Sequence, residues 1–208
     1  ALVEGFMALL LILPSNPFAL LPTTPAEGTG LNPLLENVGM IFHPPTLFVG
    51  YALYTVPFAF VVAGLLSGQP SDAWMARTRR WSLVAWAFLS VGIILGAWWA
   101  YVELGWGGYW GWDPVENSSL IPWLVGTAAL HSAAMQRRRG IFRTWTALLS
   151  VLTFGLCIFA TFVTRSGVIQ SVHAFNRSPI GTYFIIFLVL VMAGAIGLLL
   201  ARRRTLAD

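Results

Sequence analysis

The residues of this sequence that could do chemistry are its three histidines and a dense cluster of tryptophans. His43 and His173 lie on either side of a tryptophan-rich segment, residues 103–123, which reads ELGWGGYWGWDPVENSSLIPW. Six tryptophans fall in or just before it: Trp98, Trp99, Trp106, Trp110, Trp112 and Trp123. So many rings can build a wide, flat, apolar shelf, while each indole N–H needs a polar partner, as at a membrane interface. The segment therefore suits a large, flat, amphipathic ligand.

A histidine on each side of an aromatic shelf is what a metalloporphyrin needs. The porphyrin faces pack on the rings, and the iron takes axial imidazole ligands. An imidazole must be neutral to bind metal, and we expect a helix that begins at Pro44 to disfavour protonation of His43 at its N-terminus. Arg165 and Arg177 flank His173, and we expect one or both to pair with the porphyrin propionates.

Simpler interpretations of these residues stay open. A single histidine at a membrane surface is usually a solvated loop residue, and interfacial tryptophans usually form an anchoring belt. Such a belt explains the tryptophans outside the segment well: Trp74, Trp81 and Trp145. It explains the density between residues 98 and 112 poorly. Arg165 can equally end a helix and extend its charge to water.

His131 is predicted to lie inside the membrane. It follows Ser118 by 13 residues on a predicted helix, which is roughly 20 Å at 1.5 Å per residue. An ionisable residue at that depth is costly and is a functional hypothesis by default, although a hydrogen-bonded packing histidine is an equal alternative. No other histidine has a matching depth, so a bis-histidine heme there would need a ligand from outside these residues.

The composition indicates an all-α, polytopic integral membrane protein. Of the 208 residues, 57% are hydrophobic and 10% are charged, and the mean hydropathy is +0.75. Several apolar runs have the roughly 20 residues that a helix needs to cross a bilayer. We expect about five full transmembrane helices, a truncated first one and the external tryptophan-rich segment. Residues 1–208 form a single transmembrane region and read as a fragment of a longer chain.

Two other classes of function find no support. All twelve basic residues are arginines, and they cluster in short loops beside apolar runs, which is typical of membrane orientation rather than of nucleic-acid binding. Cys157 is the only cysteine and lies in an apolar run. Thiol redox chemistry and a thiolate metal site are therefore not expected, and Cys157 is predicted to be a buried core residue.

Hydrophobic runs and helix-breaking residues divide the chain into six predicted helices. The expected ranges are 1–13, 44–66, 81–101, 113–136, 145–163 and 180–201, with loops at 14–37, 67–80 and 164–179. Pro57 is predicted to kink the second helix. Asp113, Pro114 and Glu116 have the spacing of an N-cap, a first helical residue and a capping-box partner, so they are interpreted most simply as a helix start.

The arginines predict which loops share a side of the membrane. Ten of the twelve lie at residues 77–80, 137–143 and 202–204, and the positive-inside rule makes that side cytoplasmic. The proline-rich loop, the tryptophan-rich segment and the His173 loop then share the opposite side. His43 and His173 are thus predicted to meet there, although they lie 130 positions apart.

Four stretches carry a resemblance to a known family. WGGYWGWDPVEN resembles the WWD motif of heme-handling proteins, which include CcmC, CcmF and CcsA. Its extension ENSSLIPWLVGTAALHS, the FHPPTLFVGY around His43 and the TFVTRSGVIQSVHAF around His173 together resemble the CcmF family and its close relative NrfE. The resemblance covers nearly the whole chain.

The resemblance implies roles for individual residues. His43 and His173 would ligate the heme b delivered by the chaperone CcmE. His131 would hold a second, intramembrane b-type heme. The motif that cradles the external heme comprises Trp106, Gly107, Gly108, Trp110, Trp112 and Asp113.

The implied function is that of a cytochrome c heme lyase subunit, a holocytochrome c synthase that forms thioethers between heme vinyl groups and the CxxCH thiols of apocytochrome c. The implied partners are CcmE, CcmH/CcmI-type subunits, apocytochrome c and membrane lipid. The implied location is the bacterial inner membrane, with the heme shelf on the periplasmic side, and the fragment alone is expected to be inactive. Two alternatives stay open: a CcmC-type heme transporter or delivery protein, and a b-type heme electron-transfer subunit.

Overall fold

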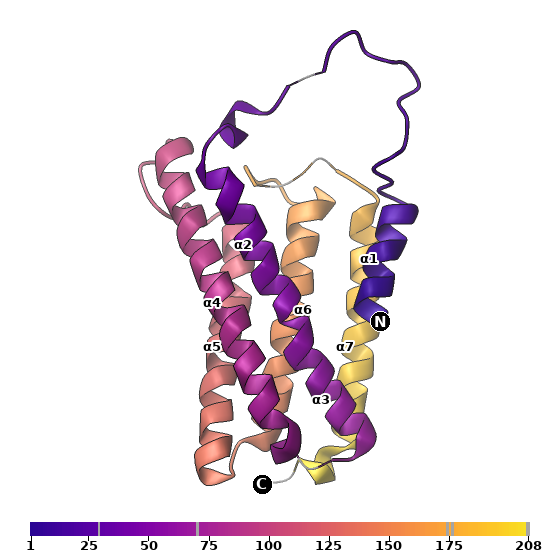
Figure 1. Cartoon of the computed structure of the whole chain (residues 1–208), viewed down its shortest axis with the longest axis vertical. Helices are drawn as coiled ribbons and strands as arrows, with labels where there is room; N and C mark the ends of the chain where they lie inside the picture. The colour runs from indigo at the N-terminus through magenta and orange to yellow at the C-terminus, as the bar shows by residue number, and fades with distance from the viewer. Residues whose placement is uncertain (29, 70, 174, 176, 207–208) are drawn as a thin grey trace.

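The described residues form a bundle of helices that lie side by side (Figure 1). The computed structural model describes residues 1–208 except 29, 70, 174, 176 and 207–208, so parts of the predicted loops at Thr29, Pro70, Ala174 and Asn176 lie outside the described residues. The elements are α1 (Leu2–Ile12), η1 (Pro33–Leu35), α2 (Gly39–Leu53), α3 (Thr55–Ser67), α4 (Ser71–Glu103), α5 (Pro114–Arg139), α6 (Arg143–Ser166), α7 (Ile180–Ala201) and η2 (Arg203–Thr205), where η marks a 3-10 helix.

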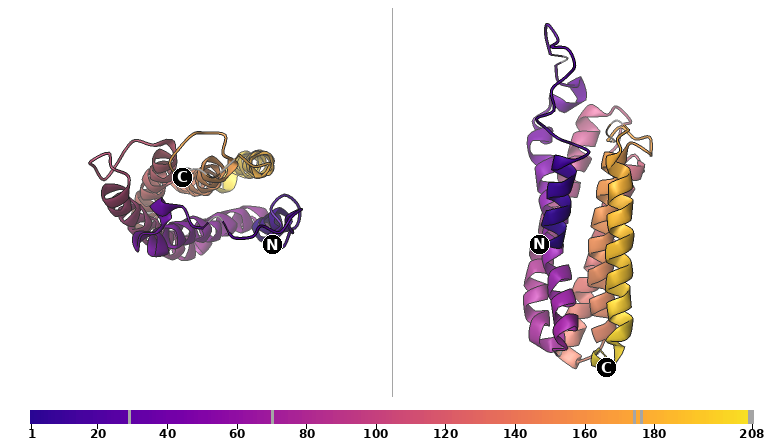
Figure 2. Two further views of the ribbon diagram at one scale, coloured as in Figure 1. Left: turned by 90° about the horizontal axis from the view of Figure 1, so that it is seen from above. Right: turned by 90° about the vertical axis from the view of Figure 1, so that its right-hand side faces the viewer.

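The helices form two layers, with α1 to α4 in one and α5 to α7 in the other (Figure 2). Side chains from both layers meet between them, and Tyr54, Leu89 and Cys157 belong to one buried cluster there. Cys157 is 1% exposed, which confirms its predicted place in the core. Burial of apolar side chains between the layers holds α2, α4 and α6 together.

The all-α, multi-pass membrane architecture is confirmed. Among the described residues, four helical segments are long and apolar enough to cross a membrane: Gly39–Ser67, Trp74–Glu103, Arg143–Ser166 and Ile180–Ala201. The α5 helix has 26 residues and packs against α4 and α6, but it is less apolar than these four. The predicted number of about five full spans is reached only when α5 is counted with them, and α1, with 11 residues, is short as expected.

The α2 helix begins earlier than predicted, at Gly39 instead of Pro44. The reason is a tertiary contact that caps it. The side-chain oxygen of Asn37 accepts a 2.7 Å hydrogen bond from the Gly39 N–H, while its amide donates a 2.6 Å bond to Glu103 at the end of α4. The cap adds a turn before His43 and places Pro44 inside the helix.

The predicted loop at 67–80 is mostly helix. The α4 helix already begins at Ser71, because Trp74 and Met75 are 5% and 4% exposed and pack into a cluster with Val61 and Leu65. Burial of these two side chains outweighs the polar character of the stretch. The arginines at 77, 79 and 80 therefore project from the first turns of a helix.

Close contact between α2 and α4 fixes the position of His43. A Cβ at Gly92 would lie 2.7 Å from the Leu47 Cα, and one at Gly50 would lie 2.8 Å from the Leu89 Cα. Small residues at these positions allow the two backbones to approach, as is common between membrane helices. The α2 helix ends at Leu53 and α3 begins at Thr55. This break agrees with the predicted effect of Pro57, whose ring excludes the hydrogen bond to the Leu53 carbonyl.

The two ends of the bundle differ in character. The starts of α4 and α6 and the ends of α5 and α7 lie at one end, together with all three arginine groups, and Arg143 there pairs with Asp72 at 3.1 Å. The proline-rich, tryptophan-rich and His173 connections lie at the other end (Figure 1). The predicted grouping of loops is therefore confirmed.

Candidate functional site

His43 lies on α2 with its ring packed against α4. Its Nδ1 lies 2.8 Å from the carbonyl oxygen of Gly92. Because a carbonyl oxygen can only accept a hydrogen bond, Nδ1 must carry the proton and act as the donor. The Nε2 lone pair is then available to a metal. The ring lies directly over Gly96, where a Cβ would overlap its Cε1 atom. The predicted position of His43 at the helix N-terminus was wrong, since α2 begins at Gly39, and the Gly92 hydrogen bond orients the ring instead.

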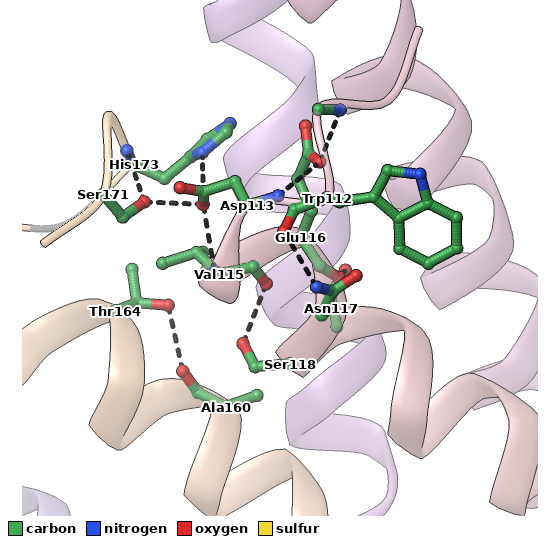
Figure 3. Close-up of polar contacts among 12 residues, drawn as sticks. Trp112, Asp113, Val115, Glu116, Asn117, Ser118, Ala160, Thr164, Ser171 and His173 are labelled. Atoms are coloured by element: carbon green, nitrogen blue, oxygen red, sulfur yellow. Dashed lines mark hydrogen bonds and ion pairs between the residues drawn. The ribbon is translucent and has the colours of Figure 1, made fainter. Parts of the chain in front are cut away.

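His173 is held by Asp113, the N-cap residue of α5. Its Nδ1 lies 3.1 Å from Asp113 Oδ2. The Ser171 hydroxyl donates a 2.6 Å hydrogen bond to the same oxygen and accepts a 2.9 Å bond from the His173 backbone N–H. The ring therefore turns Nδ1 toward the carboxylate and its second nitrogen away from it (Figure 3).

Trp99 brings the two histidines together. Its indole is 2% exposed, lies parallel to the His43 ring at 6.4 Å between centroids and meets the His173 ring edge-on at 5.3 Å. Both histidines line a cavity of about 310 Å³ beside Trp99, whose other lining residues include Leu47, Phe48, Val115, Val172 and Phe175. The predicted meeting of His43 with His173 is therefore realised by the fold.

A second, smaller cavity of about 30 Å³ connects the histidines to the tryptophan-rich segment. Both histidines, Trp110, Glu116 and Ser119 line it. The Trp110 indole N–H is buried and has no hydrogen-bond partner among the described residues. A buried N–H of this kind favours an acceptor supplied by a ligand or by water.

The tryptophan-rich segment between α4 and α5 exposes two of its indole rings and half-buries that of Trp110. Trp106 and Trp112 are 37% and 73% exposed, and Trp112 has a left-handed backbone with φ of +56°. The Trp110 and Trp112 rings meet at 85°, so these neighbouring rings do not lie in the single plane that a flat shelf implies. Gly107 has φ of +73°, which explains the glycine at that position.

A capping box at the start of α5 holds the segment in place. The Glu116 carboxylate accepts hydrogen bonds from the N–H groups of Gly111, at 2.9 Å, and Asp113, at 3.2 Å. Asp113 accepts in return from the Val115 N–H at 3.0 Å, and Asn117 donates to the Trp112 carbonyl at 3.0 Å. The predicted helix start is confirmed, and Asp113 has the additional contact with His173 that the spacing alone did not predict.

The two arginines on this side occupy different places. The Arg165 guanidinium lies 4.1 Å from the ring centroid of Phe175, and Phe175 lines the cavity of the two histidines. Arg177 lines a separate groove between α6 and α7. Arg165 itself lines a groove beside α1 and α7 and meets the histidine cavity only through Phe175.

His131 lies on the outer surface of α5, toward the arginine-rich end. Its Nδ1 lies 2.8 Å from the Thr127 carbonyl oxygen, so Nδ1 donates and Nε2 is left available, as in His43. It lines a groove of about 390 Å³ together with Met135, Phe142 and Trp145. The structure does not bring His131 to the other two histidines, and no second histidine shares its level among the described residues.

Comparison with known proteins identifies the family. A family model described as Cytochrome C assembly protein matches residues 2–171. The chain is 54% identical over 200 residues to the cytochrome c-type biogenesis protein CcmF of Pseudomonas aeruginosa, covering 95% of this chain and 30% of that protein. The chain belongs to the CcmF family of cytochrome c assembly proteins.

Other members of the family agree with this assignment. CcmF of Escherichia coli is 52% identical over 95% of this chain and 31% of its own length. NrfE of Haemophilus influenzae is 47% identical over 95% and 31% respectively. A solved structure, Cytochrome c Heme Lyase CcmF, matches with a TM-score of 0.77 and 34% identity, over 95% of this chain and 29% of that one. The chain thus spans about three-tenths of the CcmF relatives that it matches.

Sequence reasoning missed two residues of this CcmF-family site. Trp99 was counted among the tryptophans, but its contact with both histidines was not predicted. Trp99 lies four residues before Glu103 and so on the same face of α4. Because Glu103 bonds Asn37 at the start of α2, this face is the one that meets His43. Ser171 lies two residues before His173, a spacing at which serine hydroxyls bond the backbone N–H, and this signal was available in the sequence.

Proposed function

We propose that this chain is the heme-handling part of a cytochrome c heme lyase. His43 and His173 hold a substrate heme from its two faces at the end of the bundle away from the arginines. The tryptophan-rich segment covers the heme edge. The whole protein attaches this heme to the CxxCH motif of apocytochrome c, and the fragment alone is inactive.

One observation carries the proposal: each histidine makes its hydrogen bond through Nδ1. The partners are the Gly92 carbonyl, the Asp113 carboxylate and the Thr127 carbonyl, at 2.8, 3.1 and 2.8 Å. Histidines that ligate metal almost always donate their other ring N–H to such an acceptor. A packing histidine has no need to keep the same nitrogen available in three unrelated settings.

The residues around His43 and His173 fit a porphyrin. Trp99 and Phe175 provide aromatic walls in a cavity that both imidazoles line. The buried Trp110 N–H offers a donor without a partner among the described residues. Arg165, stacked on Phe175, is the cation placed to pair with a propionate at the cavity rim. These features support heme as the ligand.

The chemistry of attachment is supplied by heme and substrate. Each cysteine S–H adds across a vinyl C=C bond, so that a C–S bond forms, the proton ends on the vinyl carbon and no group leaves. The chain contributes orientation, because groups held at the correct angle react as if at very high concentration. The histidines fix the heme plane, and the apolar rings keep water from its faces.

His131 provides a second heme site within the same proposal. Its exposed ring on α5 and its Nδ1 bond to Thr127 support His131 as the residue that would hold an intramembrane b-type heme, with a partner ligand outside these residues. That heme would supply the electron that keeps the substrate heme ferrous. The paired histidines at one depth that an electron-transfer cytochrome b requires are not present among the described residues, which makes this alternative weaker.

The remaining assignments follow from the family. The heme chaperone CcmE would deliver the substrate heme, and CcmH/CcmI-type subunits would present apocytochrome c. The arginine-rich end lies in the cytoplasm and the histidine cavity in the periplasm of a bacterial inner membrane, on the positive-inside rule. A CcmC-type role in heme delivery is the second candidate, since it also uses two histidines around a tryptophan-rich segment.

Heme content and absorption spectra of the full-length protein, co-expressed with the chaperone, test the proposal. We expect His43→Ala and His173→Ala to lose the same heme signal, and His131→Ala to lose a different one. Retention of the first signal in both external variants would show that the cavity does not hold heme. If the wild-type protein binds heme but attaches none to apocytochrome c, the delivery role is favoured instead.

A further inference from the structure

The external histidines differ in the acceptor that each one faces. His43 donates to the Gly92 carbonyl, which is neutral. His173 faces the Asp113 carboxylate, with both side chains largely buried at 14% and 11% exposure. A hydrogen bond to an ionised acceptor is roughly twice as strong as one between neutral groups. The two imidazoles are therefore oriented by interactions of unequal strength.

A single carboxylate oxygen organises the loop that carries His173. Asp113 Oδ2 accepts from the Val115 N–H at 3.0 Å, the Ser171 hydroxyl at 2.6 Å and the His173 ring at 3.1 Å. The first bond caps α5, and the other two tie the His173 loop to that cap (Figure 3). Because α5 is a long and well-packed helix, its N-terminus is a rigid anchor for a loop whose described residues form no helix or strand.

Ser171 closes a small ring of hydrogen bonds. Its hydroxyl donates to Asp113 and accepts from the His173 backbone N–H at 2.9 Å. The serine thereby fixes the backbone of His173, while Asp113 fixes the imidazole. Removing Asp113 frees the imidazole to rotate about its side-chain bonds, whereas removing the Ser171 hydroxyl loosens the backbone that carries it.

We infer that Asp113 and Ser171 are positioning residues, which act on the heme through His173 and not by contact with it. This inference rests on the proposed function. The pair keeps the Nδ1–H tautomer of His173 and presents Nε2 to the iron. Because the outer partner of His173 is anionic, its ring is the more firmly held of the two, so that His173 is the stronger ligand and His43 the one that a substrate histidine displaces.

Two variants separate positioning from capping in the full-length protein. Asp113→Asn keeps an N-cap residue of nearly the same shape, since asparagine caps helices as well as aspartate does, but removes the charge. Ser171→Ala leaves the Val115 cap bond intact and removes only the link to the His173 backbone. Matched controls are Asp72→Asn at the opposite end of the bundle and Ser178→Ala in the same loop, whose hydroxyl accepts from the Ile180 N–H.

The first readout needs no heme. Nitrogen-15 spectra of the histidine-labelled protein report which ring nitrogen carries the proton. We expect His173 to be the Nδ1–H tautomer in the wild type and a mixture of tautomers in Asp113→Asn, with His43 unchanged. An unchanged His173 tautomer in Asp113→Asn would overturn the role of Asp113.

The second readout uses the loaded protein. We expect Asp113→Asn and Ser171→Ala to lower heme affinity about 10- to 100-fold, as is typical when an outer partner of a ligand is lost. Asp113→Asn should also raise the reduction potential of this heme, by about 59 mV for each tenfold loss of preference for ferric iron. Suppose that both variants keep the wild-type heme affinity and reduction potential, while His173→Ala loses heme. Asp113 would then act only as a helix cap. Heme retained in His173→Ala as well would contradict the proposed function itself.

Discussion

Trp86 on α4 and Trp123 on α5 stack with their ring centroids 5.7 Å apart and their planes 25° from parallel. Each indole N–H also bonds a hydroxyl on the opposite helix. Trp86 donates to Thr127 at 2.8 Å, and Trp123 donates to Ser90 at 2.7 Å. The pair thereby fixes the register of α4, which contacts His43, against α5, which carries His131.

This reciprocal pair predicts a strong energetic coupling. We expect Trp86→Phe and Trp123→Phe each to lower the free energy of unfolding by about 1 kcal/mol, the net value of a hydrogen bond. The double variant should depart from additivity by about 0.5–3 kcal/mol, because the rings share one contact. Denaturation of the four proteins in one detergent measures the coupling, with Trp81→Phe as the control at an exposed ring of α4. Strict additivity would show that the two rings act independently.

Gly96 is predicted to be essential for the position of His43. An added Cβ would overlap the His43 ring, so Gly96→Ala should displace the imidazole and lower external heme content at least tenfold, while overpacking costs about 1–3 kcal/mol of stability. The His131-dependent heme signal should persist. Gly194→Ala is the matched control, since a Cβ there meets no atom within 4 Å. Normal external heme in Gly96→Ala would mean that His43 tolerates displacement or does not bind.

Trp112 is predicted to serve heme binding and not stability, because its backbone is strained and its ring is exposed. Its φ of +56° costs a non-glycine residue about 1–2 kcal/mol, and its ring is 73% exposed, so the fold gains little from it. We expect Trp112→Gly to raise the thermal midpoint and to lower heme retention, while Trp112→Phe keeps both close to wild type. Thermal unfolding and heme content measure the two effects. A glycine variant that retains heme fully would remove Trp112 from the proposed site.

Arg165 and Arg177 are predicted to differ although both flank His173. Arg165 stacks on Phe175, which lines the histidine cavity, whereas Arg177 lines another groove. Arg165→Ala should therefore weaken heme retention about 10- to 150-fold, in line with loss of a charge-assisted hydrogen bond worth about 1.5–3 kcal/mol. Arg177→Ala should not. Heme affinity in detergent, compared at low and high salt, checks this difference, and equal effects of the two variants would contradict it.

The sequence alone determined the all-helical architecture and the grouping of the loops at the two ends of the bundle. Apolar runs of about 20 residues, interrupted by proline and arginine, permit few arrangements in a bilayer, because each spanning backbone must satisfy its own hydrogen bonds. Alternation of the arginine groups then brought His43 and His173 to the same end. The Asp113, Pro114 and Glu116 spacing predicted the start of α5 for a local reason, since a capping box involves only neighbouring residues.

The contacts that orient the histidines were decided by the tertiary structure. The starts of α2 and α4 were misplaced because an Asn37 cap held by Glu103, and a Trp74 buried against α3, depend on distant partners. The bonds from His43 to Gly92 and from His173 to Asp113 span 49 and 60 positions, and no local pattern specifies them. They form because the packed fold fixes these side chains within hydrogen-bond distance, which is how two histidines from distant parts of the chain come to present the same ring nitrogen.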